Sequence, residues 1–238
     1  MNLFKPYHIA TTNAHKLREI ALAGFKIAAK SPDFDAPEPL ASLPEIVIDK
    51  SRCAGPMSIV EDTAVFIDGF PDAGVTIKKF EKDRRMHEAI GFNAAYRVAM
   101  AINNGTTIFV VERSLLGVIV PSVEAPQTHA HSYDGYAFSQ FFKPVEFKTT
   151  YDATITEFAI PFSPRVRCMK MLQELLVARI NYTRFDKLTS TGGGKGEEDP
   201  IEKENAFLMR CLNGAANSIT SCVPSHGPLW TGAFQEPC

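Results

Sequence analysis

The feature that most constrains this chain is an apolar stretch interrupted by two adjacent acids. The run from Met57 to Val60 is mainly apolar, Glu61 and Asp62 follow, and a second apolar run covers Ala64–Ile67. Burying an isolated carboxylate costs free energy unless a partner compensates its charge. Two acids at the end of a buried strand therefore favour a bound cation or a reacting water. A strand end with two solvated acids fits the stretch alone equally well.

The charge of the whole chain limits where partners for an anionic ligand could come from. The 238 residues suffice for one large domain or two small ones, and 45% of them are hydrophobic, as in ordinary globular proteins. The formal net charge of -2 excludes a general basic surface for nucleic acid. Any anion must therefore be bound by a local cluster of lysines.

Cysteine spacing and hydrophobic runs indicate the compartment. The cysteines lack CxxC spacing, which argues against a structural zinc site and a dense disulfide framework; they are Cys53, Cys168, Cys211, Cys222 and Cys238. Pairing among the last three stays open. No signal-peptide pattern is present, and no apolar run reaches the length of about 18 residues that a membrane helix needs. We expect a cytoplasmic protein without a membrane partner.

A strand that leads directly into a helix is predicted near the N-terminus. Tyr7–Thr12 is apolar and partly β-branched, and a helical apolar face begins at Leu17, with Thr12 or Asn13 as the N-cap. Free backbone N–H groups at such a helix start suit a phosphate, and Lys16 could add its charge. The alternative is an ordinary strand–helix unit with a capped helix.

The remaining chain predicts an alternation of strands and helices. The apolar periodicity and turn signals indicate, in order, a proline-rich loop over 31–44, a brief strand or helix lead-in over 46–48, a turn over 69–72, a basic helix over 75–86, a hairpin of strands 93–102 and 106–111, a further strand over 115–120, a helix over 164–184, a low-complexity linker over 189–199, a possible helix over 200–216 and an irregular tail.

Two further clusters fit either a core or a ligand. The aromatic residues around Tyr136 and Phe141 are typical of a core, although aromatic rings beside a glycine can also stack a base. Arg165, Arg167 and Lys170 crowd the start of a helix, where positive charge opposes the helix dipole. A bound anion would relieve that repulsion, and a basic surface face is the alternative.

Taken together, the motifs resemble those of the Ham1/inosine triphosphate pyrophosphatase family. The matching segments are Thr11–Glu19, with Thr12 in place of a glycine, Leu43-Pro44-Glu45 followed by Lys50, Val60-Glu61-Asp62-Thr63, and Thr76–Phe80. Two base-recognition motifs depart from the family pattern. The aromatic turn has Ala137 and Phe138 in place of aspartate and proline, and Pro164 replaces the histidine between Ser163 and Arg165.

The resemblance implies an α/β fold, with a long twisted mixed sheet flanked by helices and two lobes around a central nucleotide cleft. It implies a homodimer that uses Mg²⁺ to split a nucleoside triphosphate, such as ITP, dITP or XTP, into monophosphate and pyrophosphate. The expected organisation is a pyrophosphatase domain over 1–185, a glycine-rich linker over 186–199 and a C-terminal extension over 200–238.

The same resemblance suggests site residues. Glu45, Glu61 and Asp62 are the expected Mg²⁺ ligands; Asp62, with Glu61 and Lys16, is expected to act in catalysis, and Asp62 positions or activates water. The triphosphate is assigned to Thr11, Asn13, Lys16, Lys50 and Lys78, and the base pocket to Tyr136, Ser163 and Arg165. Two alternatives stay open: the same reaction on another base, and a nucleotide-binding or regulatory protein that has lost turnover.

Overall fold

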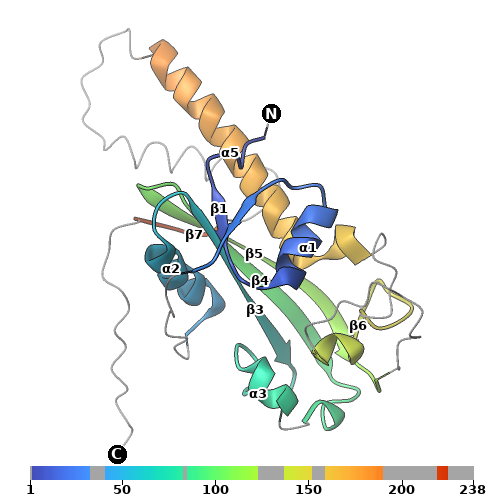
Figure 1. Ribbon diagram of the computed structural model, residues 1–238. Coiled ribbons are helices and arrows are strands. Elements are labelled where there is room, and N and C mark those ends of the chain that lie inside the picture. The colour runs from blue at the N-terminus through green and yellow to red at the C-terminus, as the bar shows by residue number, and fades with distance from the viewer. Residues whose placement is uncertain are drawn as a thin grey trace, which may run out of the picture.

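Three long antiparallel strands form the centre of the protein (Figure 1). They are β3 (Ser58–Ile67), β4 (Asn93–Asn103) and β5 (Thr107–Ile119), each paired with the next over most of its length. A computed structural model describes residues 2–32, 41–82, 85–122, 137–151, 159–189 and 219–224. At residues 78, 81, 82, 137, 180–189 and 219–224, the structure describes the backbone alone.

Shorter strands extend this centre into a seven-stranded mixed sheet. The order is β2-β1-β3-β4-β5-β6, and β7 also pairs with β5. The strands β1 (His8–Ala10) and β2 (Ala28–Lys30) are parallel to their neighbours, whereas β6 (Phe142–Pro144) and β7 (Ile219–Pro224) are antiparallel to β5. The predicted α/β fold with a mixed sheet is confirmed.

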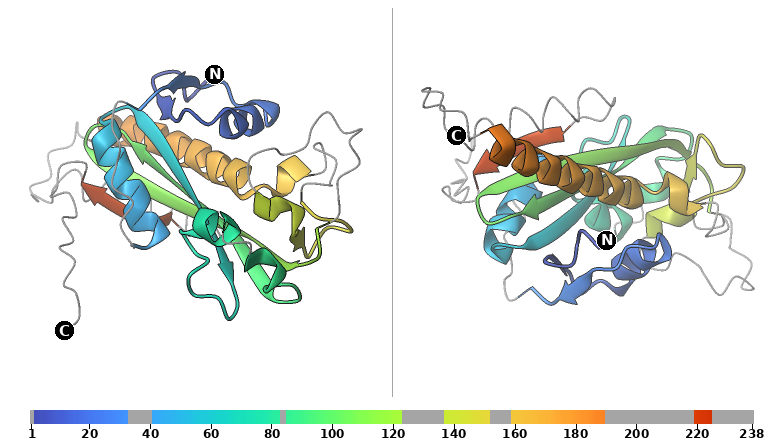
Figure 2. Two further views of the ribbon diagram at one scale, coloured as in Figure 1. Left: turned by 60° about the horizontal axis from the view of Figure 1, so that its bottom comes forward. Right: turned by 90° about the horizontal axis from the view of Figure 1, so that it is seen from above.

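Helices cover both faces of the sheet (Figure 2). One face carries α2 (Leu43–Ala54), and the other carries α1 (Ala14–Leu22) and α5 (Pro164–Thr189). Side chains alternate along a strand, so β3 contributes Ile59 and Val65 to the α5 side and Val60 and Ala64 to the α2 side. The remaining helical turns are short: α3 (Ile77–Lys82), η1 (Arg85–His87), η2 (Ala137–Gln140) and η3 (Ile160–Phe162).

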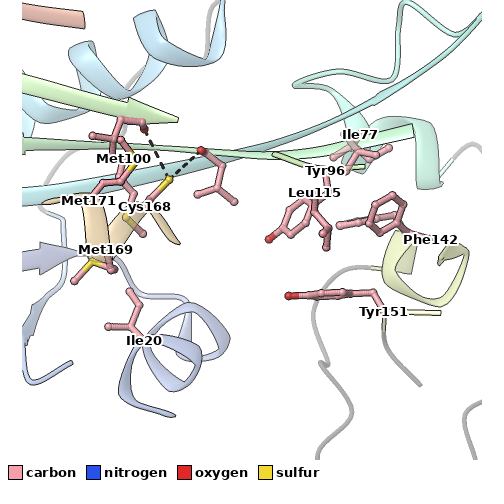
Figure 3. Packing of buried hydrophobic residues seen from close by; sticks show 14 of the residues in the cluster. Ile20, Ile77, Tyr96, Met100, Leu115, Phe142, Tyr151, Cys168, Met169 and Met171 are labelled. Atoms are coloured by element: carbon pink, nitrogen blue, oxygen red, sulfur yellow. Dashed lines mark hydrogen bonds between the residues drawn. The ribbon is translucent and has the colours of Figure 1, made fainter. Parts of the chain in front are cut away.

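The larger core lies between the sheet and α5. Apolar residues at helical spacing within the predicted helix over 164–184 are buried in α5, at Val166, Met169, Leu172 and Leu176. Each such side chain contributes about 1.5–3 kcal/mol through burial. Figure 3 shows methionines and Cys168 of this core on one side, and an aromatic group around Tyr96, Phe142 and Tyr151 on the other.

Five sequence predictions need correction. In place of the basic helix predicted over 75–86, the structure has the short helix α3 and the separate 3₁₀ turn η1. The strands predicted over 106–111 and 115–120 are the single strand β5 (Thr107–Ile119), because β4 pairs with it without interruption. Residues 46–48 lie inside α2, whose start is set by a capping box between Ser42 and Glu45. The helix predicted to end at 184 extends to Thr189. Part of the tail expected to be irregular is the strand β7, which gains its backbone partners from the distant β5.

Among the helices that the structure describes, none is long and apolar enough to cross a membrane.

Two cysteines are expected to differ sharply in reactivity. Cys168 is buried, its Sγ donates to the carbonyl oxygens of Val98 (3.4 Å) and Val111 (3.9 Å), and burial raises the pKa of its thiol (Figure 3). Cys53 is exposed. Iodoacetamide should modify Cys53 in the folded protein and Cys168 only after denaturation, as read by peptide mass spectrometry. Equal modification of both in the folded protein would contradict this packing.

Candidate functional site

The two adjacent acids of β3 point to opposite faces of the sheet. Glu61 lies on the face of α1 and α5, where it meets Lys16 and Arg165, whereas Asp62 lies on the face of α2, where it meets Lys50. The expectation that the two acids lie at the end of a strand is wrong. They lie inside the ten-residue strand β3, in which successive side chains alternate between the faces of the sheet.

Glu61 is held by a set of donors inside the protein. Arg165 binds both of its carboxylate oxygens, with Nε 2.7 Å from Oε2 and Nη2 3.2 Å from Oε1. The hydroxyl of Thr63 donates to Oε1 at 2.8 Å, and Nζ of Lys16 lies 3.2 Å from the same oxygen. The side chain of Glu61 is only 1% exposed. Such a carboxylate is already saturated by cationic and hydroxyl donors.

A second buried acid completes this cluster from α1. Glu19 accepts hydrogen bonds from Nη1 of Arg165 and from the hydroxyl of Ser163. Glu19, Ser163 and Arg165 are all buried, which puts two carboxylates around one guanidinium. Lys16 supplies the second positive charge, so the formal charges of the cluster cancel. We call Lys16, Glu19, Glu61 and Arg165 the buried ion cluster.

The opposite charges of the buried ion cluster stabilise the ionised forms of its members. Burial by itself would raise the pKa of Glu61, but the positive charges of Arg165 and Lys16 outweigh it and lower that pKa to about 2. Burial disfavours the charged form of Arg165, yet Glu19 and Glu61 hold the pKa of its guanidinium well above the ordinary value. Glu61 is therefore ionised and Arg165 protonated at neutral pH.

Asp62 has a more open environment on the α2 face. Its Oδ2 accepts a hydrogen bond from Nζ of Lys50 at 2.8 Å, and its Oδ1 accepts the backbone N–H of Thr63 at 2.8 Å. The side chains of Asp62 and Lys50 are 20% and 18% exposed. This pair can therefore reach a ligand, which Glu61 cannot do.

An open stretch of strand edge lies between the two faces. β1 pairs with β3 only through His8 and Ile9, so Glu61–Thr63 extend beyond its end. Among the residues that the structure describes, no strand pairs with that edge of β3 at Glu61–Thr63. Groups from both faces of the sheet can approach one ligand at this edge.

The turn from β1 into α1 is organised as predicted. The side chain of Asn13 caps α1 by accepting the N–H groups of His15 (2.9 Å) and Lys16 (3.4 Å), which confirms Asn13 as the N-cap. Thr11 Oγ1 accepts the N–H of Asn13 at 3.1 Å. Thr11 and Asn13 thus shape the segment that follows β1, and their contact with a triphosphate stays a prediction.

The expected metal ligands are not gathered into one cluster. Oε2 of Glu45 accepts the N–H and hydroxyl of Ser42 at 2.8 and 2.6 Å, and these bonds lower the pKa of Glu45. The described residues contain no group of three or more His, Cys, Asp or Glu side chains that could hold a metal ion. Mg²⁺ often needs only one or two carboxylates, because water and substrate phosphates supply its other ligands. Asp62 fits that donor role, Glu45 retains one carboxylate oxygen outside the cap, and the saturated Glu61 does not fit.

The expected base pocket is only partly described. Ser163 and Arg165 face the buried carboxylates, while Tyr136 lies outside the described residues. Lys78 is described only as backbone of α3. The sequence motifs gave no indication of the roles of Glu19 and Thr63, although these residues end the segments Thr11–Glu19 and Val60–Thr63. Their burial opposite Arg165 was not visible in the sequence.

One comparison with known proteins decides the family. The model of the Ham1 family matches residues 7–175, from the residue before β1 into α5, and includes all the candidate site residues. This chain belongs to the Ham1 family. No curated protein matches the chain.

Ham1 proteins are nucleoside triphosphate pyrophosphatases, and these enzymes generally depend on a divalent metal. Membership therefore supports hydrolase activity in nucleotide metabolism. Within this Ham1 chain, the matched region holds the buried ion cluster and the Asp62–Lys50 pair. The strand β7 lies beyond the matched region.

Removing Arg165 should destabilise the fold strongly. Arg165→Met leaves Glu19 and Glu61 buried without their shared cation, a change that typically costs about 3–5 kcal/mol. Arg167→Met is the matched control, because Arg167 is exposed two residues further along α5, and it should change stability by less than about 0.5 kcal/mol. Urea unfolding measures both. Equal effects of the two substitutions would contradict a structural role of the cluster.

Proposed function

We propose that this chain is a Mg²⁺-dependent pyrophosphohydrolase of nucleoside triphosphates. Its substrates are non-canonical purine nucleotides such as ITP, dITP and XTP, and its products are the monophosphate and pyrophosphate. The observation that carries the proposal is the Asp62–Lys50 pair in a Ham1 chain, where an accessible carboxylate lies 2.8 Å from an ammonium group beside an open strand edge.

The reaction requires a water molecule to attack a highly anionic phosphorus. Asp62 orients that water and accepts its proton, while the new O–P bond forms at the α-phosphorus. The bond between the α-phosphorus and the bridging oxygen then breaks, and pyrophosphate leaves with that oxygen. The proton on Asp62 passes to solvent, which returns the carboxylate to its starting state.

Lysines on both sides of the strand edge supply positive charge. Lys50 turns from Asp62 to a phosphate oxygen, which also frees an oxygen of Asp62 for the water. Lys16 approaches from the opposite face, at the first turn of α1. Lys78, Thr11 and Asn13 complete the proposed triphosphate site. Fixed positive groups of this kind stabilise the charge that develops in the transition state.

Asp62 and Glu45 are the carboxylates proposed to hold the metal. Both offer the hard oxygen ligands that Mg²⁺ prefers, and they come from β3 and α2, which pack against each other. When bound, Mg²⁺ neutralises phosphate charge and polarises the reacting phosphoryl group.

The proposal also covers the base of the substrate, the oligomeric state of the enzyme and its cellular compartment. Ala137 and Pro164 stand where the family pattern has an aspartate and a histidine, which favours testing several bases. Tyr136, Ser163 and Arg165 are the proposed base-pocket residues. We place the active enzyme in the cytoplasm as a homodimer.

The test is a screen of canonical and non-canonical nucleoside triphosphates with Mg²⁺, read as pyrophosphate release. We expect hydrolysis of at least one non-canonical purine nucleotide and loss of turnover with EDTA. A preference for a canonical base would mean that the enzyme catalyses the same reaction on a different substrate. Tight binding without any pyrophosphate release would favour a protein that has lost turnover.

Asp62→Asn should abolish most of the turnover while the protein stays folded. Losing a general base lowers kcat by about 100-fold or more. Asp49→Asn is the matched control, since Asp49 pairs with Arg52 at 3.2 Å on α2 and lies outside the proposed chemistry. Full activity of Asp62→Asn would remove Asp62 from the mechanism.

Lys16→Ala should weaken triphosphate binding. A hydrogen bond to a charged group contributes about 1.5–3 kcal/mol, so KM should rise roughly tenfold or more. Lys26→Ala serves as the control, because Lys26 is exposed in the segment after α1. Unchanged KM and kcat in Lys16→Ala would refute the phosphate role of Lys16.

A further inference from the structure

We propose that Glu61 is a positioning residue that holds Lys16 in place for the triphosphate, and that Arg165 in turn holds Glu61. This inference rests on the proposed function and assigns Glu61 a task other than metal binding. The observation behind it is the closed arrangement of the buried ion cluster. In this cluster, each charged group contacts a group of opposite sign on another element.

The cluster forms a ring that begins and ends on α1. Lys16 contacts Glu61 of β3, Glu61 contacts Arg165 of α5, and Arg165 contacts Glu19. Glu19 lies three residues after Lys16 on α1, a spacing that places both on one helix face. Moving Lys16 away from Glu61 would therefore leave one carboxylate of the ring short of a partner.

Arg165 fixes the carboxylate that Lys16 meets. Its planar guanidinium contacts both oxygens of Glu61, and this geometry sets the orientation of the carboxylate as well as its position. Thr63 donates to Oε1, the same oxygen that lies 3.2 Å from Lys16. The lysine thus faces an acceptor with little freedom to move.

The contact with Glu61 prepares Lys16 for phosphate binding, because an unrestrained lysine side chain is flexible. Ordering its long stem costs up to about 2 kcal/mol of conformational entropy, which binding must otherwise supply. Its side chain is 13% exposed, so it lies between the buried cluster and the surface. An ammonium group has three N–H donors, so a lysine that donates to a carboxylate can also donate to phosphate oxygens. Glu61 can therefore hold Lys16 before and after the substrate binds.

The location of Glu61 separates this task from that of Asp62. Glu61 is 1% exposed, and both of its oxygens already accept hydrogen bonds, whereas Asp62 lies on the other face with a fifth of its side chain accessible. A metal ion bound by Glu61 would have to displace Arg165 or Lys16 from its carboxylate. We therefore expect changes at Glu61 to affect phosphate binding and to leave the metal dependence intact.

The test is a double-mutant cycle between Glu61→Gln and Lys16→Ala, with the best triphosphate substrate. Glu61→Gln keeps the shape of the side chain and removes its charge. It should raise KM roughly five- to twentyfold, within the range that contacting residues show, and affect kcat less. In the Lys16→Ala background, the same change should alter KM less than about twofold. The Mg²⁺ concentration for half-maximal activity should stay the same.

Two outcomes would overturn the inference. An equal rise of KM in both backgrounds means that Glu61 does not act through Lys16. A shift of the Mg²⁺ requirement in Glu61→Gln means that Glu61 binds the metal. If Glu61→Gln does not fold, Thr63→Val replaces it in the cycle, because it removes a hydrogen bond to the same Oε1 without changing charge. Its smaller rise of KM should likewise depend on Lys16, and independence from Lys16 would overturn the inference.

Calorimetry separates a failure of this inference from a failure of the proposed function. Binding of inorganic triphosphate without metal should be weakened by Lys16→Ala and by Glu61→Gln, with little further loss in the double variant, even if no nucleotide is hydrolysed. Asp49→Asn should bind like the unaltered protein. Binding that is indifferent to Glu61 would overturn the positioning role whatever the screen for activity shows.

Discussion

The ion pairs around Arg165 are the interaction on which the rest of the site depends. They join α1, β3 and α5, and they do so in the interior, where an unpaired charge is costly. Their formation requires α5 to dock with Arg165 facing the sheet and α1 to present Glu19 to it. The packing of the two helices and the position of Lys16 are therefore coupled through one guanidinium.

The strand β3 distributes the chemistry between the faces of the sheet. Glu61 faces the buried ion cluster, while Asp62 faces Lys50 and the more open side. The short β1 stops before it reaches these residues, and no strand that the structure describes pairs with that edge of β3. A structural acid and a candidate catalytic acid can in this way occupy neighbouring positions without repelling each other across a shared pocket.

The family match gives this division a functional setting. Ham1 proteins hydrolyse nucleoside triphosphates, and the matched region contains both the accessible acid and the lysines that would face phosphate. The residues assigned to the base show a different pattern, because Ser163 and Arg165 contact the buried acids Glu19 and Glu61. Arg165, which the resemblance assigns to the base pocket, is thus also the centre of the buried ion cluster.

The sequence by itself determined the local elements: the strand that leads into α1, a helix cap at Thr12 or Asn13, the hairpin of β4 and β5, and the apolar face of α5. These follow from periodicity and from caps a few residues away. The alternation of side chains along a strand also predicts that Glu61 and Asp62 face opposite sides of the sheet, provided that the strand continues through both residues. The sequence Ser42-Leu43-Pro44-Glu45 also contains the capping-box pattern that marks the start of α2.

Only the tertiary structure decided which charges meet. Arg165 lies 104 residues from Glu61 and 146 from Glu19 in sequence, and no local pattern specifies such pairs. The strand β7 likewise depends on the tertiary structure, because its backbone partners belong to β5, which is distant in sequence. Long-range ion pairs and strand pairing depend on how whole elements dock, and docking is set by the complete core rather than by a short window of residues.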